Sequence, residues 1–539
     1  MRRAEVLPVL LAGVLLALLW TWPLGGSLGD AVAFDPARSS SLRAGHHAWV
    51  WQTWQASQAL GAGGPYFQAG GLLVGGEDLL RSDHPLLPGV LASPITAVGG
   101  ATLAGNLLFL GLLAGGFAAA YALLRGVGAR PLAATGGALA WGFSPAALGG
   151  GLLDPGALGG PVPPLFLLLL LRWMALGSGA PGGRTAYAAG AGALFAAQVL
   201  CAPRAALLLA FLGVATAVLA PPSRAGGIRT SRRGLGHAEA MLAFLAVALV
   251  GMLPFWIEAW SGWGAWGLFV GTERGIPGAG AVLRPAGMHP WLGSGTKAFE
   301  LAPGFVLVGL AVLALVRELR STRWLLLALA LAPAPWWGLV APEKAWSFFL
   351  LPLAVAAAFA LEGILARGGK RLALGLVVAV VFELQVAGIE LADAGPPDPV
   401  ARIAALAPVD EHAGAVCVVG HLGGAHAGLT WQTKHRRPVL FGPQLVDPAA
   451  FQRWGQTAPD LRDFLLGTRL PQPDALALDL QLQEIDHVLL PGADRPGAAP
   501  LVELLDDMAG WERASTEDDV AWWYRSGLAG AVAQVSEGG

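Results

Sequence analysis

Long apolar runs separated by short polar turns cover most of the chain before residue 392. Eleven of these runs are predicted to cross a bilayer, although several are short or interrupted by Gly and Pro. They are 6–24, 101–124, 131–143, 162–176, 185–199, 205–220, 238–257, 303–316, 324–340, 347–365 and 372–391. A further run, 86–98, is too short to cross and is predicted to dip into the membrane or lie at its surface. The pattern predicts an all-α polytopic membrane domain over 1–392.

The pattern changes after Pro396 to that of a soluble domain. Short strand-like runs alternate there with helical stretches, which favours a small α/β domain over 393–539. The predicted strands are 415–419, 438–441, 487–490, 511–514 and 520–524. The predicted helices are 400–406, 449–454, 461–466, 475–483 and 500–508.

The positions of Arg and Lys predict the orientation of the bundle. With the N-terminus inside, sixteen of them fall on the cytoplasmic side and eight in the opposite loops before Asp393. This is the positive-inside pattern, and it predicts a cytoplasmic N-terminus and an extracytoplasmic C-terminal domain. The run 6–24 is longer than the apolar part of a signal peptide, about 7–15 residues, and is predicted to be an uncleaved first span. Two large outer loops follow, 25–85 and 260–301.

The composition agrees with this membrane class. The 539 residues are 55% hydrophobic and only 13% charged, against about 25% charged in soluble domains, and the mean hydropathy is +0.58. With a net charge of −2 and no basic stripe, the chain shows no nucleic-acid signature. Cys201 and Cys417 are far apart in sequence, and no disulfide framework can be argued from them.

The first outer loop, 25–85, carries the strongest candidates for chemistry. Carboxylates near a membrane surface are costly to desolvate, and this loop holds several of them. Asp35 and Asp30 are the candidates for a general base in sugar transfer, which needs an ionisable group at the membrane surface. The alternative is structural: either residue could be a turn residue or the N-cap of an amphipathic helix predicted over 44–60.

Other polar residues are predicted on the same outer face. Asp83 and His84 precede the return to the membrane; with Asp30 or Asp35, Asp83 could bind a divalent cation through oxygen ligands. Their spacing has no metal signature, and capping of the next segment is the favoured alternative. The outer loops also hold ionisable residues that border apolar spans: Arg284, Glu343 and Lys344.

Three further features have weaker signals. The turn GHLGGAHAG after the first predicted strand only superficially resembles a phosphate-binding loop. His421, His426 and His435 lack the spacing of a zinc site, and a surface or domain-contact role is favoured. Glu383 lies inside the last predicted span, where an acidic residue is expected to have a function. The alternative is that Glu383 faces a water-filled cavity or a neighbouring Arg.

Several stretches of the chain can be compared with known families. The region of the first outer loop carries TWPLGGSLGDAVAFDP, AWVWQTWQASQAL and LLRSDHPLLPGVL. Later runs are GALAWGFSPAAL and PEKAWSFFLLPLAVAAAFALEG, and the C-terminal domain carries WQTKHRRPVLFG. These stretches resemble bacterial membrane proteins of the C-type (GT-C) glycosyltransferase superfamily. The resemblance covers most of the chain as an overall pattern.

The resemblance implies an enzyme of the bacterial inner membrane with a polyprenyl-phosphate sugar as donor. In that superfamily an acidic residue of the first outer loop is the catalytic base, which by position would be Asp35 or Asp30. The donor phosphate would lie near Lys344 or Arg284, and the acceptor would be an envelope glycan, lipid or protein. The alternative class is a transporter or assembly factor for envelope polysaccharide. A transporter is expected to show an internal repeat and broken helices at mid-membrane, and the sequence shows no such repeat.

Overall fold

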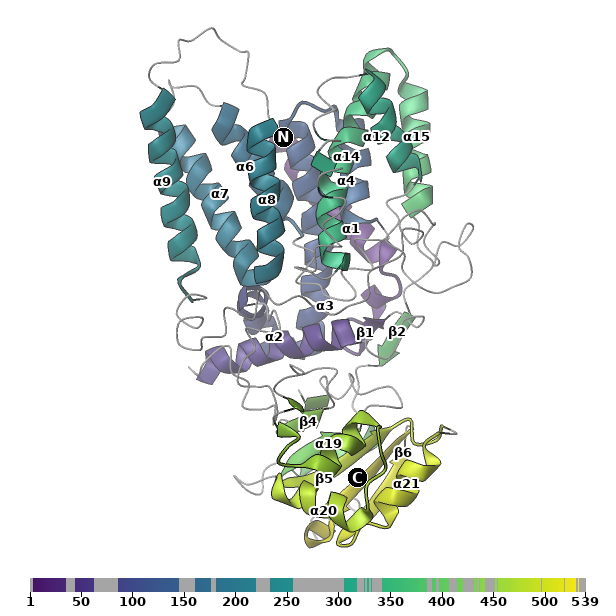
Figure 1. Ribbon diagram of the computed structural model, residues 1–539. Helices are drawn as coiled ribbons and strands as arrows, with labels where there is room; N and C mark the ends of the chain where they lie inside the picture. Colours follow the sequence, from purple (N-terminus) through teal and green to yellow (C-terminus); the bar gives the residue numbers. More distant parts are fainter. Residues whose placement is uncertain are drawn as a thin grey trace.

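The protein consists of a helical bundle followed by a small C-terminal domain with a five-stranded sheet (Figure 1). The structure is a computed structural model. It describes residues 3–34, 44–62, 86–144, 160–175, 181–219, 233–254, 305–317, 324, 327–328, 331, 342–384, 390–393, 397–406, 414–419 and 431–532, the last range without 433, 436, 442–450, 453, 496, 518 and 530–531.

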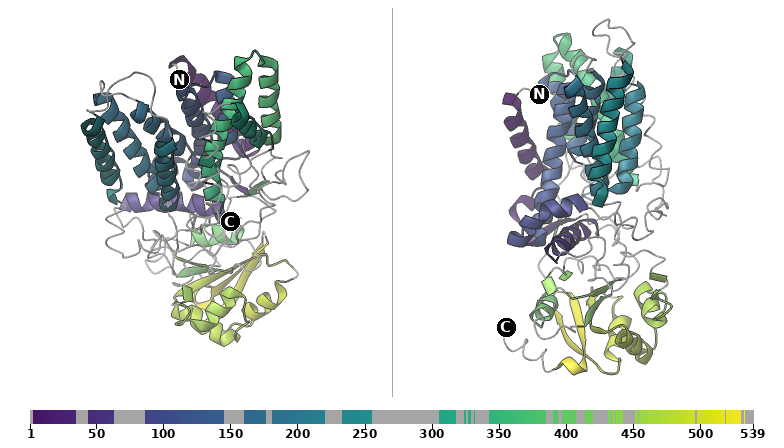
Figure 2. Two further views of the ribbon diagram at one scale, coloured as in Figure 1. Left: turned by 45° about the horizontal axis from the view of Figure 1, so that its top comes forward. Right: turned by 90° about the vertical axis from the view of Figure 1, so that its left-hand side faces the viewer.

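The described bundle helices run roughly side by side between two ends. They are α1 (Arg3–Trp20), α3 (Leu86–Gly126), α4 (Pro131–Gly142), α6 (Val162–Ala175), α7 (Pro181–Cys201), α8 (Pro203–Leu219), α9 (Arg233–Gly251), α12 (Phe305–Arg317), α14 (Pro342–Ala366) and α15 (Lys370–Leu384). The N-terminus lies at one end, and the C-terminal domain lies beyond the other (Figures 1 and 2). We call these the N-terminal end and the domain end of the bundle.

These helices occupy ten of the eleven predicted spans. The span predicted at 324–340 falls mostly outside the described residues, and the last predicted span ends earlier than expected, at Leu384 rather than at 391. Two described helices, Leu86–Gly126 and Phe348–Ala366, are long and apolar enough to cross a membrane, while other apolar helices are shorter. The number eleven therefore stays a prediction.

Helix α3 is two helical segments joined at a kink. Gly100 has φ of 82°, a left-handed conformation that interrupts regular α-helix and that glycine adopts without steric cost. The segment before it corresponds to the run at 86–98 that is too short to cross. The segment after it contains the predicted span at 101–124.

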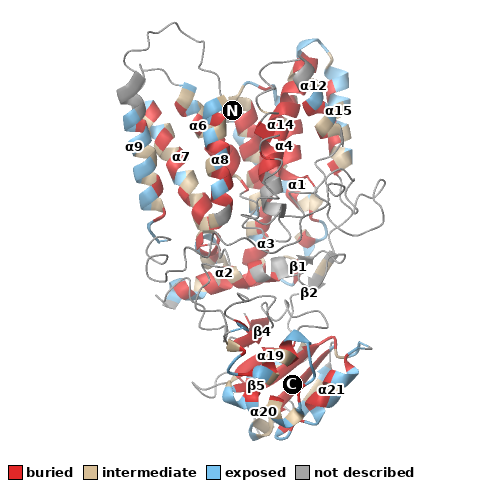
Figure 3. Ribbon diagram, viewed as in Figure 1, coloured by how far each residue is buried: buried red, intermediate tan, exposed pale blue. Residues whose placement is uncertain are grey.

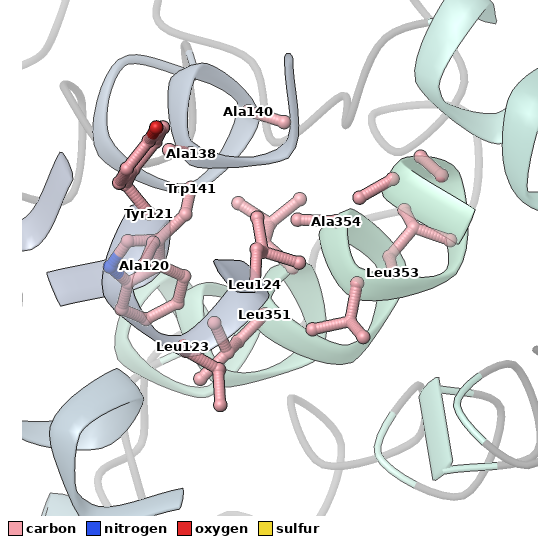
Figure 4. Packing of buried hydrophobic residues seen from close by; sticks show 14 of the residues in the cluster. Ala120, Tyr121, Leu123, Leu124, Ala138, Ala140, Trp141, Leu351, Leu353 and Ala354 are labelled. Atoms are coloured by element: carbon pink, nitrogen blue, oxygen red, sulfur yellow. The ribbon is translucent and has the colours of Figure 1, made fainter. Parts of the chain in front are cut away.

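The centre of the bundle is packed by small, aliphatic and aromatic side chains of α3, α4 and α14 (Figure 4). A Cβ atom at Gly137 would lie 2.7 Å from Leu124 Cδ1 and 2.9 Å from the Ala354 carbonyl oxygen. Glycine at this position therefore lets α4 approach both neighbours closely, as small residues do between membrane helices.

The outward surface of the bundle is apolar. Leucine and valine side chains on α1, α8, α9 and α15 are more than half exposed, and Figure 3 shows exposed residues in pale blue along α9 and α15. The leucines and valines are Leu7, Leu11, Leu15, Leu19, Val214, Val218, Leu242, Leu249, Val250, Leu372, Leu374 and Val378. A soluble monomer rarely exposes so large an apolar surface, which is the surface expected of helices that face lipid.

Helix α2 (Ala44–Ala62) lies across the domain end of the bundle, almost perpendicular to the long helices (Figure 1). It confirms the helix predicted at 44–60. Its tryptophans at 49, 51 and 54 are buried. Buried aromatic rings anchor the helix through large apolar contact areas.

The C-terminal domain is built on a sheet with strand order β4-β3-β5-β7-β6. The strands are β3 (Ala415–Val418), β4 (Val439–Phe441), β5 (Ile485–Pro491), β6 (Trp511–Glu517) and β7 (Val520–Arg525). Strands β4, β3 and β5 are mutually parallel, and β7 and β6 complete the sheet in antiparallel pairs. Its helices are α16 (Asp398–Ala405), α19 (Pro459–Leu466), α20 (Pro473–Leu482) and α21 (Ala499–Asp506). The predicted α/β character is confirmed.

The two faces of this sheet pack against different partners. On one face, Ala415 and Cys417 share a cluster with residues of α19, α20 and α21. On the other face, the alternate residues Val416 and Val418 share a cluster with α16 and with tryptophans of α2. Because successive side chains of a strand point to opposite faces, one sheet connects the helices α19, α20 and α21 to helix α2.

Candidate active site at the domain end of the bundle

The first outer loop begins with a strand that pairs with the segment after the last bundle helix. Strand β1 (Ala31–Phe34) is antiparallel to β2 (Glu390–Asp393), with Ala31 opposite Asp393 and Phe34 opposite Glu390. The sequence analysis did not predict this pairing. It joins two segments that are about 360 residues apart in sequence, and the predicted domain boundary at 392/393 falls inside β2.

A buried asparagine of α3 clamps the segment that carries Asp30. The Asn106 side-chain amide donates hydrogen bonds to the Leu28 carbonyl oxygen at 2.8 Å and to the Ala31 carbonyl oxygen at 2.7 Å. Asn106 is fully buried. Since both amide hydrogens are used on either side of Asp30, the backbone at this position is fixed relative to α3.

The Asp30 side chain is exposed at the domain end of the bundle. Asp30 lies in a turn just before β1, and none of the ion pairs between described residues involves it. The turn alternative is therefore correct for its backbone, but Asp30 is not the N-cap of α2, which begins at Ala44. Asp35 follows β1 directly and lies outside the described residues.

Helix α2 is held on both sides at this end. Trp49 Nε1 donates a hydrogen bond of 3.0 Å to the Gly105 carbonyl oxygen of α3. Trp51 Nε1 donates one of 2.7 Å to Gln432 Oε1 in the C-terminal domain. Gly105 itself is needed for the close packing, because a Cβ atom there would lie 2.9 Å from Val50 Cγ2.

Of the other predicted site residues, the structure describes the position of two. Glu343 and Lys344 lie in the first turn of α14, at the domain end of the bundle. Arg284, Asp83 and His84 fall outside the described residues. Within the described part of the chain, no three His, Cys, Asp or Glu residues are grouped so that they could hold a metal ion, and the predicted divalent cation stays a prediction.

Glu383 has a structural role that the sequence analysis did not anticipate. Its Oε2 accepts a hydrogen bond of 2.7 Å from the Val306 backbone N–H, in the first turn of α12. The carboxylate therefore lies where the N-terminal N–H groups and dipole of a helix favour a negative charge.

A polar cluster is buried in the C-terminal domain beside the Trp51 contact. Arg437 Nη1 lies 3.1 Å from His487 Nε2, and Trp522 Nε1 donates to His487 Nδ1 at 3.3 Å. Burial, with the nearby Arg437 charge, lowers the pKa of His435 and of His487 to about 3. Both imidazoles are therefore neutral at physiological pH, and the domain-contact role predicted for His435 agrees with its burial.

Two residues of this region have a faint signal in the sequence. Asn106 is a single amide in the apolar run LAGNLLFL, and a polar residue within a span usually has a partner. Gln432 lies next to Trp431 in WQTKHRRPVLFG, a stretch that the sequence analysis noted only for its resemblance. Their partners are too distant in sequence to be predicted without the fold.

Comparison with known proteins identifies the fold. No protein-family model and no curated protein matches the sequence. Solved structures do match. The arabinofuranosyltransferase AftD from Mycobacteria is 15% identical with a TM-score of 0.59; the match covers 97% of this chain and 40% of AftD. ArnT from Cupriavidus metallidurans, in the apo state, is 12% identical with a TM-score of 0.55, covering 96% of this chain and 98% of ArnT.

A third solved structure agrees. The oligosaccharyltransferase AglB from Archaeoglobus fulgidus, in complex with an inhibitory peptide and a dolichol-phosphate, is 12% identical with a TM-score of 0.52. The match covers 94% of this chain and 71% of AglB. All three are GT-C glycosyltransferases, so the chain has a GT-C-like fold and the resemblance seen in the sequence is confirmed. This chain spans only about two fifths of the AftD chain.

Proposed function

We propose that this protein is a membrane glycosyltransferase that transfers a sugar from a polyprenyl-phosphate donor to an acceptor hydroxyl on the outer face of a bacterial inner membrane. The observation that carries the proposal is the fixed segment from Leu28 to Phe34. Asn106 and strand β2 hold it at the domain end of the bundle, and it leads directly into Asp35. The fold and the dolichol-phosphate in the AglB structure support a lipid-linked donor.

The chemistry requires one base and one phosphate contact. The carboxylate of Asp35, with Asp30 as the second candidate, takes the proton of the acceptor hydroxyl as its oxygen attacks the anomeric carbon. The bond between that carbon and the donor phosphate oxygen breaks, and polyprenyl phosphate leaves with the bonding electrons. No nucleotide is needed at any step.

Lys344 is the proposed phosphate contact, with Arg284 as reserve and Glu343 beside it. The position of Lys344 in the first turn of the 25-residue helix α14 supports this role. The N-terminus of a helix favours anions through its free N–H groups and its dipole, and a lysine there adds a positive charge. Asp83 and His84, at the end of the same outer loop, are proposed to line the substrate site.

The test is transfer by the full chain in lipid nanodiscs, with a panel of polyprenyl-phosphate sugars and envelope glycan, lipid or peptide acceptors. Asp35→Asn should lower the transfer rate by about 10²–10⁴-fold with donor affinity unchanged, because Asn keeps the shape but cannot accept the proton. Asp30→Asn is the matched control, since only one of the two should be severe. Full activity in both variants would remove the first outer loop as the catalytic site. No transfer by the unmodified protein with any pair would favour the transporter or assembly-factor alternative.

A further inference from the structure

Helix α2 connects the bundle to the C-terminal domain through two tryptophans that are two positions apart. Successive residues of an α-helix are rotated by about 100°, so Trp49 and Trp51 point to nearly opposite sides of the helix. Trp49 bonds to α3 of the bundle, and Trp51 bonds to Gln432 of the C-terminal domain. The helix is therefore held between the two parts of the protein, as its place in Figure 1 also shows.

The Gln432 amide is fixed from the domain side. Its Oε1 accepts from Trp51, and its Nε2 donates to the Arg437 carbonyl oxygen at 3.0 Å. The Arg437 guanidinium in turn contacts His487 of β5, and the Arg437 backbone N–H donates to His435 Nδ1 at 3.1 Å. Because both the oxygen and the nitrogen of the Gln432 amide are hydrogen-bonded, the Trp51 indole is held in a fixed position relative to the sheet.

This contact is shielded from water. Gln432 is fully buried, and Trp51 is 4% exposed. Apolar residues of β1, α2 and the sheet belong to the same cluster, among them Val32, Trp54 and Trp522. If one partner of a buried hydrogen bond is removed, no water can replace it, and the other partner stays unpaired. Breaking this contact is therefore costly in free energy.

Helix α2 also packs against β1, the strand that follows Asp30. Val32 of β1 shares a buried cluster with Trp51 and Trp54, while Asn106 and β2 hold the same strand. A shift of α2 relative to the bundle would therefore disturb β1 and the turn that carries Asp30.

We infer that the C-terminal domain is a positioning part of the candidate active site, and that Gln432 is the positioning residue that holds α2, and through it β1 and the turn with Asp30, against the bundle. This inference rests on the proposed function for its effect on transfer, but not for its effect on α2. Gln432 touches no reacting atom in this scheme; it acts through Trp51.

The chain offers a matched control. Trp454 Nε1 donates to Gln483 Oε1 at 2.9 Å, a second tryptophan–glutamine hydrogen bond, with both partners inside the C-terminal domain. Gln432→Leu thus removes a buried bond between α2 and the domain, and Gln483→Leu removes a partly buried bond of the same donor and acceptor type within the domain. Trp51→Phe removes the N–H from the other side of the contact while keeping an aromatic ring in place.

The experiment measures hydrogen exchange of α2 in the full chain in nanodiscs, without substrate, and then transfer. Gln432→Leu and Trp51→Phe should each speed exchange in α2 at least about tenfold, and Gln483→Leu should leave it unchanged. Gln432→Leu and Trp51→Phe should also each lower kcat by about tenfold to a hundredfold, because small misplacements of a catalytic group have effects of this size. The Kd for the donor should not change. The double variant should be no worse than the more severe single variant, because both remove one contact.

The outcomes separate the inference from the proposed function. Unchanged α2 exchange in Trp51→Phe and Gln432→Leu would overturn the inference, whether or not the protein transfers a sugar. Faster exchange in α2 with unchanged kcat in an active protein would overturn the positioning role. If the unmodified protein transfers nothing, the proposed function fails, while α2 exchange still decides whether Gln432 holds the helix. If Gln432→Leu unfolds the domain, Trp51→Phe alone decides.

Discussion

The two ends of the bundle are held together by different kinds of contact. At the N-terminal end, Arg125 forms a two-point ion pair with Glu5, with N–O distances of 3.1 and 3.3 Å. Next to it, Arg130 pairs with Glu362 at 3.0 Å. These pairs tie α1 to α3 and α4 to α14 with charged groups.

At the domain end, the described contacts are mostly between neutral groups. Asn106 bonds to two backbone carbonyl oxygens, and the Trp20 indole of α1 donates to the Leu384 carbonyl oxygen of α15 at 3.2 Å. The Trp49 and Trp51 contacts are of the same neutral kind. Hydrogen bonds from indole and amide groups thus join the elements at this end, whereas arginine–glutamate ion pairs join them at the other end.

This difference matters for the proposed function. Neutral groups fix the backbone around Asp30, and the Asp30 carboxylate itself is exposed and forms no ion pair among the described residues. The domain end therefore combines a fixed backbone with an exposed carboxylate, which the proposed reaction would use.

The largest effect is expected from removing the neutral clamp. Asn106→Leu conserves much of the side-chain volume but leaves the Leu28 and Ala31 carbonyl oxygens without their donor. A buried polar group left unpaired costs about 1–3 kcal/mol. Because the bond to Leu28 is only partly buried, the free energy of unfolding should fall by about 2–4 kcal/mol rather than by the full sum for two groups. Transfer should fall at least about tenfold, because the Asp30 segment loses its support. Thermal unfolding in detergent and the transfer assay measure the two effects.

Thr135→Val is the control for Asn106→Leu. Thr135 Oγ1 bonds to the Pro131 carbonyl oxygen within its own helix, at the N-terminal end of the bundle. Its loss should change neither stability nor transfer by a comparable amount. Equal effects of the two variants would show that the position of Asn106 has no special role.

The next effect concerns charge at the domain end. Lys344→Ala should weaken binding of a polyprenyl phosphate about tenfold or more, because a charge-assisted contact contributes about 1.5–3 kcal/mol and tenfold corresponds to about 1.4 kcal/mol. Titration of the lipid into the purified protein measures the affinity. The same affinity in Lys344→Ala, in Arg284→Ala and in the double variant would exclude both residues.

The sequence predicted the individual elements well because each has a local cause. Ten of the eleven apolar runs became bundle helices between α1 and α15, with shifts in their ends, and the alternating pattern after Pro396 became β3 to β7. Helix α2 follows from the local run AWVWQTWQASQAL. Such patterns depend on residues within one or two turns, which a single sequence contains.

The contacts that organise the candidate site could not be predicted in this way. Strand β1 is only four residues long, and its partner β2 begins at Glu390. Trp51 and Gln432 are 381 residues apart. A lone polar residue shows that a partner is needed but not which one, and for Glu383 the partner is a backbone N–H that any residue could supply.

A smaller effect is expected from low pH on the stability of the C-terminal domain. The pKa of His435 and of His487 is lowered to about 3 by burial and by Arg437, against about 6.5 in the unfolded chain. Below pH 6.5 only the unfolded state takes up these protons, so stability is complete above 6.5 and falls as the pH falls towards 3. At pH 5.5 the loss should reach up to about 1.4 kcal/mol for each histidine.

Hydrogen exchange of β5 in the full chain at pH 7.5 and 5.5, corrected for the intrinsic rate, measures this loss. His487→Gln should remove much of the difference between the two pH values. Equal corrected protection of β5 at both pH values in the unmodified protein would show that the two imidazoles do not destabilise the domain in acid.

The smallest effect on transfer is expected at the N-terminal end. Glu5→Gln removes the charge of the pair with Arg125, whose side chain is 19% exposed against 22% for Glu5. Because the pair is partly buried and two-pointed, the free energy of unfolding should fall by about 1 kcal/mol, near the upper limit for exposed pairs. A double-mutant cycle with Arg125→Gln isolates the pair energy from the Arg125 bond to the Ala129 carbonyl oxygen. Transfer should stay within about twofold of the unmodified protein, since no part of the first outer loop moves. If Glu5→Gln instead lowered transfer as much as Asn106→Leu, the two ends would be coupled through the bundle. The charged contacts at the N-terminal end would then affect transfer as much as the neutral contacts at the domain end.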